Sequence, residues 1–160
     1  MSAPTVGTGP DVRLHHEDEY RFRVRFSRGA PGLVADLPLP LGDAAGPDPV
    51  ELLAAAIGHC LASSFLFCLR KARIDPEGLE VEVQVEKVRD ESNHLRVGRV
   101  RVALAPTLGA EDRRRLGRCL DLFESFCVVT ESVRRGIPVD VLVEPAAAGQ
   151  EVGQACPPAA

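Results

Sequence analysis

The chain has no tryptophan, and aromatic residues make up only 4% of its 160 positions. A hydrophobic core must therefore be built from aliphatic side chains, and a hydrophobic content of 45% is sufficient to supply them. The length suits one domain, which we expect over residues 11–145, with flexible tails at residues 1–10 and 146–160 because both ends are rich in small residues and proline.

The sequence also has no excess of positive charge. The formal net charge is −4, and basic and acidic residues are interspersed, so the sequence lacks the basic footprint of a nucleic-acid-binding protein. No apolar run approaches the roughly 20 residues of a membrane span, and the first ten residues do not have the pattern of a secretory signal. We therefore expect a cytoplasmic protein with neither nucleic acid nor a membrane as its partner.

The spacings typical of zinc sites are absent, since neither Cys-x-x-Cys nor His-x-x-x-His occurs. Five cysteines are present, and an odd number without a signal peptide argues against a structural disulfide framework. We expect neither a metal nor an organic cofactor. Functional thiols in the cytoplasm are usually catalytic or redox-sensing, which directs attention to the cysteines themselves.

The pattern of hydrophobic residues predicts an α+β fold. Strict alternation predicts a strand at residues 20–26, with short strands at 12–15 and 33–37, and a hairpin at 79–86 and 95–104. Helices are predicted from 49 to about 74, from 109 to about 125, and from 127 to 136, followed by a last strand at 137–143. Because the strands are grouped rather than alternating with helices, a doubly wound sheet is excluded.

The long helix has a clear start. Asp48 is a candidate N-cap, Pro49 suits the first helical position, and Glu51 suits the third position of a capping box. The helix is apolar on nearly all sides until Arg70. Two small sheets of one subunit cannot cover such a helix, so we expect an intertwined homodimer with two of these helices at its centre.

Two cysteines stand in distinctive contexts. Cys60 lies about three turns into the long helix, among small residues. Cys127 is predicted at the start of a short helix, where the helix N-terminus favours the thiolate. Each residue taken alone is better explained as a packed, unreactive thiol, because free cysteine is among the most buried residue types.

Together these contexts resemble the osmotically inducible protein C and organic hydroperoxide resistance superfamily, over residues 20–143. The family's Pro-x-Glu-Leu-Leu-like helix start corresponds to residues 49–53, ahead of Cys60. Its Cys-Pro-Val-Ser/Thr-like motif with a later Gly-Ile corresponds to residues 127–130 and 136–137. The loop at residues 37–42 is similar to the family's loop before the helix.

The resemblance implies an intertwined α+β homodimer that acts as a thiol-dependent peroxidase on organic or other hydroperoxides. It implies that Cys60 attacks the peroxide and that Cys127 resolves the sulfenic acid as a disulfide, which a thiol reductant then reduces. The alternative is a ligand-binding or redox-sensing dimer of the same fold without turnover. A plain interaction domain with structural cysteines is a third possibility.

Three departures place the chain nearer the broader branch of the superfamily. Val50 stands where the peroxidase branches carry glutamate, and Val128 replaces the usual proline. Glu51 follows one residue later, and it is either a catalytic residue that orients an arginine or only the capping-box residue. The family's Gly-Arg-Asp-Gly turn is not found. The arginines of residues 20–26 are candidates for its role, although they also suit an exposed strand face.

Overall fold

A computed structural model describes residues 10–143 and residue 145 of the chain. The chain divides into two compact units, residues 50–137 and the remainder, and each is described by itself. The predicted tails at 1–10 and 146–160 lie outside the described residues, apart from residue 10. The predicted domain bounds therefore stay a prediction.

The first unit contains a three-stranded antiparallel meander. Its strands are β1 (Val12–Asp18), β2 (Arg21–Phe26) and β3 (Leu33–Ala35), in the spatial order β1-β2-β3. Alternation along β2 buries Val24, while the arginines of the strand face the other way. This confirms the predicted strands, with β1 longer and β3 shorter than expected.

Asp36 organises the loop that follows β3. Its buried carboxylate accepts hydrogen bonds from the backbone N–H groups of Leu37 (2.8 Å), Asp43 (3.1 Å) and Ala45 (3.1 Å). Burial of Asp36 opposes its ionisation, but these bonds and the Arg21 guanidinium, 3.6 Å away, outweigh it and lower the pKa of the carboxyl. The carboxylate thus accepts hydrogen bonds from backbone N–H groups that have no partner in regular secondary structure in this loop.

The second unit is built on the helix α1 (Pro49–Lys71). The helix begins at the predicted proline and ends a few residues early, where Arg73 adopts a left-handed conformation (φ 57°). By length and apolar composition alone α1 could cross a membrane, and the core helix of a soluble protein meets the same criterion. The prediction that no apolar run reaches that length is therefore wrong for α1.

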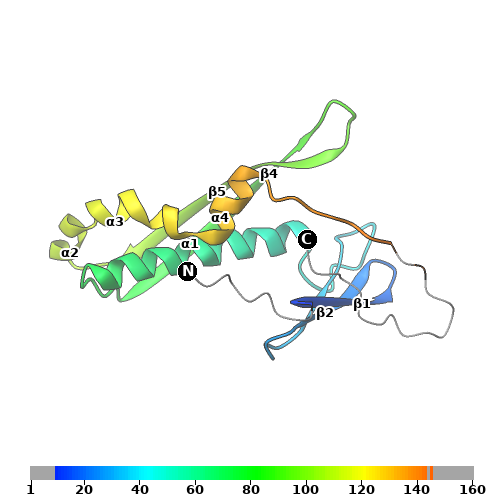
Figure 1. Ribbon diagram of the computed structural model, residues 1–160, viewed down its shortest axis with the longest axis horizontal. Helices are drawn as coiled ribbons and strands as arrows, with labels where there is room; N and C mark the ends of the chain where they lie inside the picture. The colour runs from blue at the N-terminus through cyan, green and yellow to red at the C-terminus, as the bar shows by residue number, and fades with distance from the viewer. Residues whose placement is uncertain (1–9, 144, 146–160) are drawn as a thin grey trace. The chain divides into compact units, whose positions relative to one another are not determined.

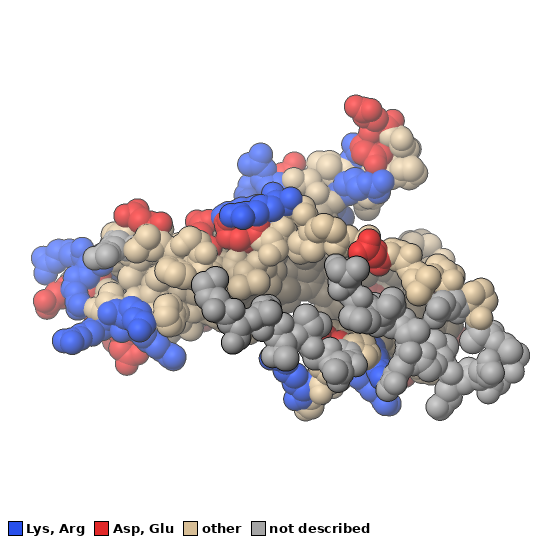
Figure 2. All heavy atoms as spheres, viewed as in Figure 1, with Lys and Arg blue, Asp and Glu red and all other residues tan. Residues whose placement is uncertain are grey.

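The antiparallel hairpin of β4 (Gly78–Arg89) and β5 (Leu95–Thr107) runs along α1 (Figure 1). Its inner face carries alternating valines and leucines, and its outer face carries charges. Across the hairpin, Arg101 of β5 forms an ion pair with Glu86 of β4 (3.4 Å). On the face of the molecule shown in Figure 2, the described Lys and Arg residues lie beside Asp and Glu residues rather than in one basic field.

Short helices complete the second unit. The predicted helix over 109–125 is broken into α2 (Ala110–Arg115), α3 (Gly117–Leu122) and the 3₁₀ turn η1 (Phe123–Phe126). The first break falls at Leu116, directly before Gly117, a residue of low helix propensity. Helix α4 (Val128–Arg135) follows as predicted and ends at Gly136 (φ 73°). Together with α1 and the hairpin, these elements form the α+β architecture that the sequence predicts.

The predicted last strand over residues 137–143 is wrong for the single chain. A strand needs a hydrogen-bonding partner, and this segment pairs with no strand among the described residues. Its apolar side chains are largely exposed, with Val139 at 80% and Val141 at 81%. The alternation therefore does not find a partner strand among residues 10–143 and 145.

One aliphatic core holds the second unit together. Phe65 of α1 packs edge-on against Phe123 of η1, with ring centroids 5.2 Å apart. Gly58 of α1 lies directly against β4: a Cβ built on it would meet the Val83 side chain at 2.7 Å. The buried members of the core are Ile57, Leu61, Phe65, Cys68, Leu69, Ile74, Leu108, Cys119, Phe123 and Cys127. The short helical elements thus contact the core mainly through Cys119 of α3, Phe123 of η1 and Cys127, the N-cap residue of α4.

Gly58→Ala should destabilise the protein even though alanine favours a helix by about 1 kcal/mol over glycine. The new methyl group must displace the stiff Val83 side chain, and overpacking of this kind costs about 1–3 kcal/mol. We expect a lower urea midpoint for Gly58→Ala and recovery in the double variant with Val83→Ala. Gly117→Ala, which meets open space, is the control. Equal midpoints for the wild type and Gly58→Ala would contradict the close packing.

Candidate active site

The fold brings together the two cysteines that the sequence singled out. Cys60 lies about three turns into α1 and is partly exposed. Cys127 follows η1, is the N-cap residue of α4 as predicted, and is fully buried. The helical turn of η1 places Cys127 over α1 because Phe123, four residues earlier, is anchored against Phe65.

The two thiols lie close enough to interact, and each of them shifts the pKa of the other. The backbone N–H groups of Val129 and Thr130, in the first turn of α4, point at both sulfurs. The Thr130 backbone nitrogen lies 3.5 Å from the Cys127 sulfur, and the Thr130 hydroxyl oxygen lies 3.0 Å from it. The pair therefore lies at a helix N-terminus, which stabilises negative charge.

These contacts lower the pKa of Cys127. Burial alone would raise it, but the hydrogen bonds from the Cys60 thiol, the Thr130 hydroxyl and the two backbone N–H groups outweigh the cost of desolvation. A sulfur that receives several hydrogen bonds is stabilised as the thiolate. Cys127 is therefore the acidic member of the pair.

Cys60 behaves in the opposite way. Burial first, and then its hydrogen bond to Cys127, raise the pKa of Cys60. Cys60 is thus the weaker acid of the two and the sulfur that solvent reaches, while Cys127 is the stronger acid and is closed to solvent. The two properties that a peroxide-reducing thiol needs, access and acidity, are divided between two neighbouring side chains.

Thr130 has a role in this pair that the sequence analysis did not assign. Thr130 belongs to the motif at residues 127–130, and the motif did not assign a function to it. Its buried side chain bonds Cys127 from the third position of α4. The spacing of a helix cap and the third residue after it is the usual capping distance, so this signal could have identified Thr130 once Cys127 was placed at the N-cap.

Glu51 is not brought to the thiol pair within one chain. It precedes Cys60 by nine residues on the same helix, which places it on the opposite face and about 13 Å along the axis. Glu51 lies in the first turn of α1, where a carboxylate interacts favourably with the helix dipole. A catalytic role for Glu51 stays a prediction.

The candidate arginines of β2 have partners of their own in the first unit. Arg21 donates to Asp43 (2.7 Å) and lies near Asp36, and Arg23 pairs with Glu17 (2.5 Å). These contacts match the interpretation of a charged strand face. They show what holds these two side chains and do not assign either of them to the thiols.

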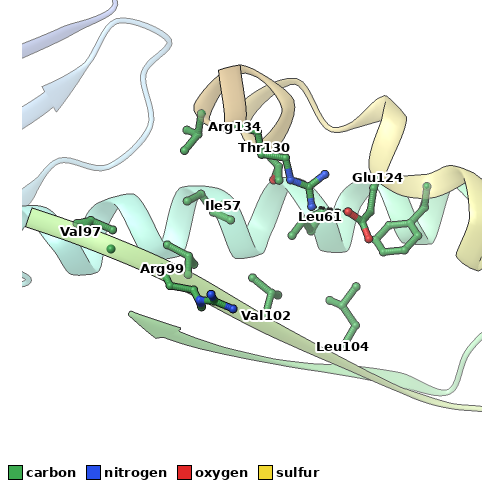
Figure 3. A pocket seen from close by; sticks show the side chains of 13 residues that line it. Ile57, Leu61, Val97, Arg99, Val102, Leu104, Glu124, Thr130 and Arg134 are labelled. Carbon is green, nitrogen blue, oxygen red and sulfur yellow. Dashed lines mark hydrogen bonds and ion pairs between the residues drawn. The ribbon is translucent and has the colours of Figure 1, made fainter. Parts of the chain in front are cut away.

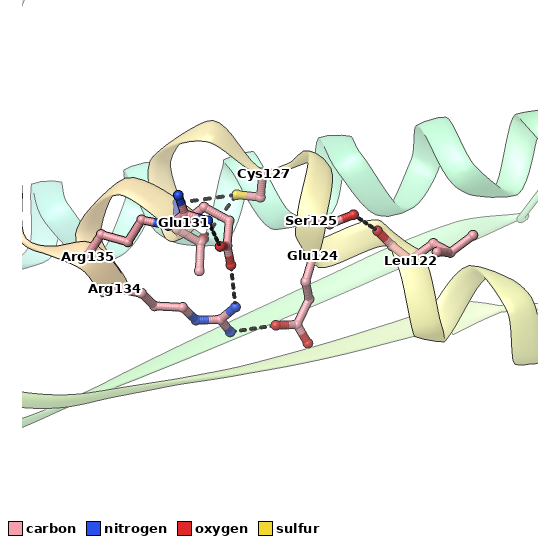
Figure 4. Close-up of polar contacts among 8 residues, drawn as sticks. Leu122, Glu124, Ser125, Cys127, Glu131, Arg134 and Arg135 are labelled. Atoms are coloured by element: carbon pink, nitrogen blue, oxygen red, sulfur yellow. Dashed lines mark hydrogen bonds and ion pairs between the residues drawn. The ribbon is translucent and has the colours of Figure 1, made fainter.

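A separate charged cluster lies beside Cys127 (Figure 4). Arg134 donates to Glu124 of η1 (2.5 Å) and to Glu131 of α4 (2.8 Å), and these hydrogen bonds raise the pKa of Arg134 above its ordinary value. Arg134 therefore joins η1 to α4 across the residue that separates them, which is Cys127. This cluster holds the turn in which the buried sulfur sits.

Cys68 and Cys119 are the other two described thiols, and both are buried in the core. Burial raises the pKa of Cys68, and the nearby Cys119 raises it further. A buried thiol with a raised pKa is a poor nucleophile. The described residues contain no group of three or more His, Cys, Asp or Glu side chains that could hold a metal ion.

Comparison with known proteins identifies related folds. The model of the OsmC-like protein family matches residues 42–142. No match was found among curated proteins. Among solved structures, an OsmC-like protein of Vibrio cholerae superimposes with a TM-score of 0.63 at 18% identity, covering 76% of this chain and 90% of that one.

Two further structures carry functional descriptions. The organic hydroperoxide resistance protein OhrB of Bacillus subtilis gives a TM-score of 0.53 at 22% identity, covering 77% of this chain and 88% of that one. An organic hydroperoxide resistance protein of Elizabethkingia anophelis gives 0.57 at 15% identity, covering 82% and 91%. At these identities the likeness establishes the fold, which is the α+β fold expected from the sequence.

Thr130→Val should raise the pKa of Cys127. Valine keeps the shape and the backbone N–H but removes the hydroxyl bond, and losing a bond to the thiolate favours the thiol. Absorbance at 240 nm, which reports thiolate without requiring access to the buried sulfur, should develop at higher pH than in the wild type. Thr130→Ser, which restores a hydroxyl, should return the curve toward the wild type. Superimposable curves for all three proteins would contradict the assignment of charge to Cys127.

Proposed function

The chain belongs to the family of OsmC-like proteins, and on that premise we propose that it is a thiol-dependent peroxidase that reduces organic hydroperoxides through Cys60 and Cys127. The observation that carries the proposal is the proximity of these two thiols at the N-terminus of α4, where each shifts the pKa of the other. The hydroperoxide resistance proteins of the same fold support the substrate class. We place the reaction in the cytoplasm, where thiol reductants are available.

The reaction begins with a proton transfer within the pair. With Cys127 in its thiolate form, Cys60 passes its proton to the neighbouring Cys127 sulfur, and the Cys60 sulfur attacks the terminal oxygen of the hydroperoxide. The O–O bond breaks, Cys60 becomes a sulfenic acid, and the alkoxide takes the proton from Cys127 to leave as an alcohol. Cys127 thus acts first as the base for Cys60 and then as the acid for the leaving group.

Resolution returns Cys127 to the thiolate form and uses it as a nucleophile. The Cys127 sulfur attacks the Cys60 sulfur, the S–S bond forms and hydroxide leaves, so that one thiol, one thiolate and one hydroperoxide give one disulfide, one alcohol and one hydroxide. A dithiol reductant then restores both thiols and is itself oxidised to a disulfide. The N–H groups of Val129 and Thr130 serve both sulfurs during these steps.

A second candidate function is a redox sensor that is oxidised once and not recycled. The raised pKa of Cys60 favours it, because the largest influences on this thiol are burial and Cys127 rather than a cation. The two candidates differ in turnover: a peroxidase consumes many equivalents of hydroperoxide with a dithiol present, and a sensor consumes one.

We further propose that the protein is a homodimer. Only 33% of the most apolar stretch of α1 is buried within the chain. An exposed stripe along it consists mainly of small side chains, with Phe67 at its far end, and its members are Ala55, Ala56, His59, Ser63 and Phe67. Small residues allow close approach of a second helix, and the unpaired segment 137–143 also suits a partner's surface. A second copy of the chain is the partner that fits both features.

Substitution of each cysteine should separate the roles. With a dithiol present, Cys60→Ser should consume no hydroperoxide, because the accessible sulfur is lost. Cys127→Ser should consume about one equivalent, more slowly, and leave Cys60 as a sulfenic acid that dimedone captures for mass spectrometry. Cys68→Ser, a change in a buried thiol outside the pair, should consume hydroperoxide as the wild type does. The reverse pattern for the first two variants would exchange the roles, and wild-type consumption that stops at one equivalent would favour the sensor.

Light scattering at micromolar concentration should give about twice the chain mass of 17.2 kDa. Ser63→Arg places a long charged side chain in the exposed stripe of α1 and should shift the mass toward that of one chain. Ser92→Arg makes the same change in the exposed hairpin turn and should leave the dimer intact. A wild-type protein that remains at the mass of one chain would rule out the proposed assembly.

A further inference from the structure

A pocket of about 340 Å³ lies within the second unit, between α1, β5, η1 and α4 (Figure 3). This volume falls in the range of small-molecule sites. Its walls are mostly aliphatic or aromatic, including Ile57, Leu61, Val100, Val102, Leu104 and Phe123. Such walls suit a hydrocarbon chain.

Four polar or charged residues also line the pocket: Arg99, Glu124, Thr130 and Arg134. Two guanidinium groups and one carboxylate favour an anion over a cation. Arg134 is already bonded to Glu124 and Glu131, whereas Arg99 forms no ion pair with any residue that the structure describes. Arg99 is therefore the group available to a ligand.

The pocket is distinct from the thiol pair, because neither Cys60 nor Cys127 lines it. Thr130 connects the two, since its side chain contributes to the wall of the pocket and bonds the Cys127 sulfur. A ligand in the pocket would lie one side chain away from the redox pair without reaching either sulfur.

We propose that this pocket binds an aliphatic monocarboxylate, with the carboxylate at Arg99 and the alkyl chain against the apolar wall formed by α1 and β5. The bidentate geometry of guanidinium and carboxylate suits this head group. Burial of each methylene contributes about 0.8 kcal/mol, so the chain supplies affinity while Arg99 supplies selectivity. The site does not depend on the peroxidase reaction, and it stands or falls independently of it.

Calorimetric titration with decanoate tests the head group on the reduced protein, with no peroxide present. Arg99→Gln should weaken decanoate binding at least five-fold. Arg101→Gln, on the same strand but outside the pocket, should change it less than two-fold. Decylamine, which has the same chain and the opposite charge, should bind the wild type at least five-fold more weakly than decanoate. Absence of decanoate binding, or equal losses in the two arginine variants, would overturn the proposal.

The position of the ligand can be tested in the unaltered protein. The chain has three isoleucines: Ile57 lines the pocket, Ile74 is buried elsewhere in the core, and Ile137 is exposed. In a protein labelled at the isoleucine δ1-methyl groups, decanoate should shift the Ile57 signal and leave Ile74 and Ile137 in place. A shift confined to Ile137, or binding without any shift of Ile57, would place the ligand elsewhere and overturn the proposal.

Discussion

The proximity of the Cys60 thiol and the Cys127 sulfur is the feature on which the proposed chemistry of this protein depends. It exists only because two distant segments are held in register. Phe123 packs against Phe65 to anchor η1 on α1, and Arg134 joins η1 to α4 through Glu124 and Glu131. The turn between these two contacts contains Cys127, so that core packing and a surface charge cluster together fix the position of one buried sulfur.

The two thiols of the pair differ in acidity and in exposure to solvent. The pKa of the fully buried Cys127 is lowered because its interactions with Cys60, Thr130 and the first turn of α4 outweigh the cost of burial. The partly exposed Cys60 can meet a substrate, but its pKa is raised. In the proposed mechanism the proton moves between the two sulfurs only when substrate is attacked, which keeps the accessible sulfur in its less reactive form until then.

Much of this architecture could be predicted from the sequence, because periodicity and capping are local signals. Alternation predicted β2, β4 and β5, and the Asp-Pro-x-Glu pattern predicted where α1 begins. The conformation of residues 137–143 could not be predicted in this way. Alternation indicates that a segment suits a strand, but it does not show whether a partner strand is available to pair with it. The difference in acidity between Cys60 and Cys127 was also inaccessible, because it depends on contacts between segments distant in sequence. The position of Glu51 relative to Cys60, in contrast, could be worked out from the sequence. The two residues are nine positions apart on one helix, and helix geometry alone places them on opposite faces.

Mass spectrometry of the protein after treatment with one equivalent of an organic hydroperoxide, digested without reduction, tests the redox pair most directly. The chain contains its own internal comparison, because Cys68 and Cys119 are also neighbouring thiols in the same core. The account predicts a Cys60–Cys127 disulfide, with Cys68 and Cys119 recovered as free thiols. A Cys68–Cys119 link in its place, or Cys127 recovered as a free thiol beside an over-oxidised Cys60, would contradict the pairing on which the mechanism is built.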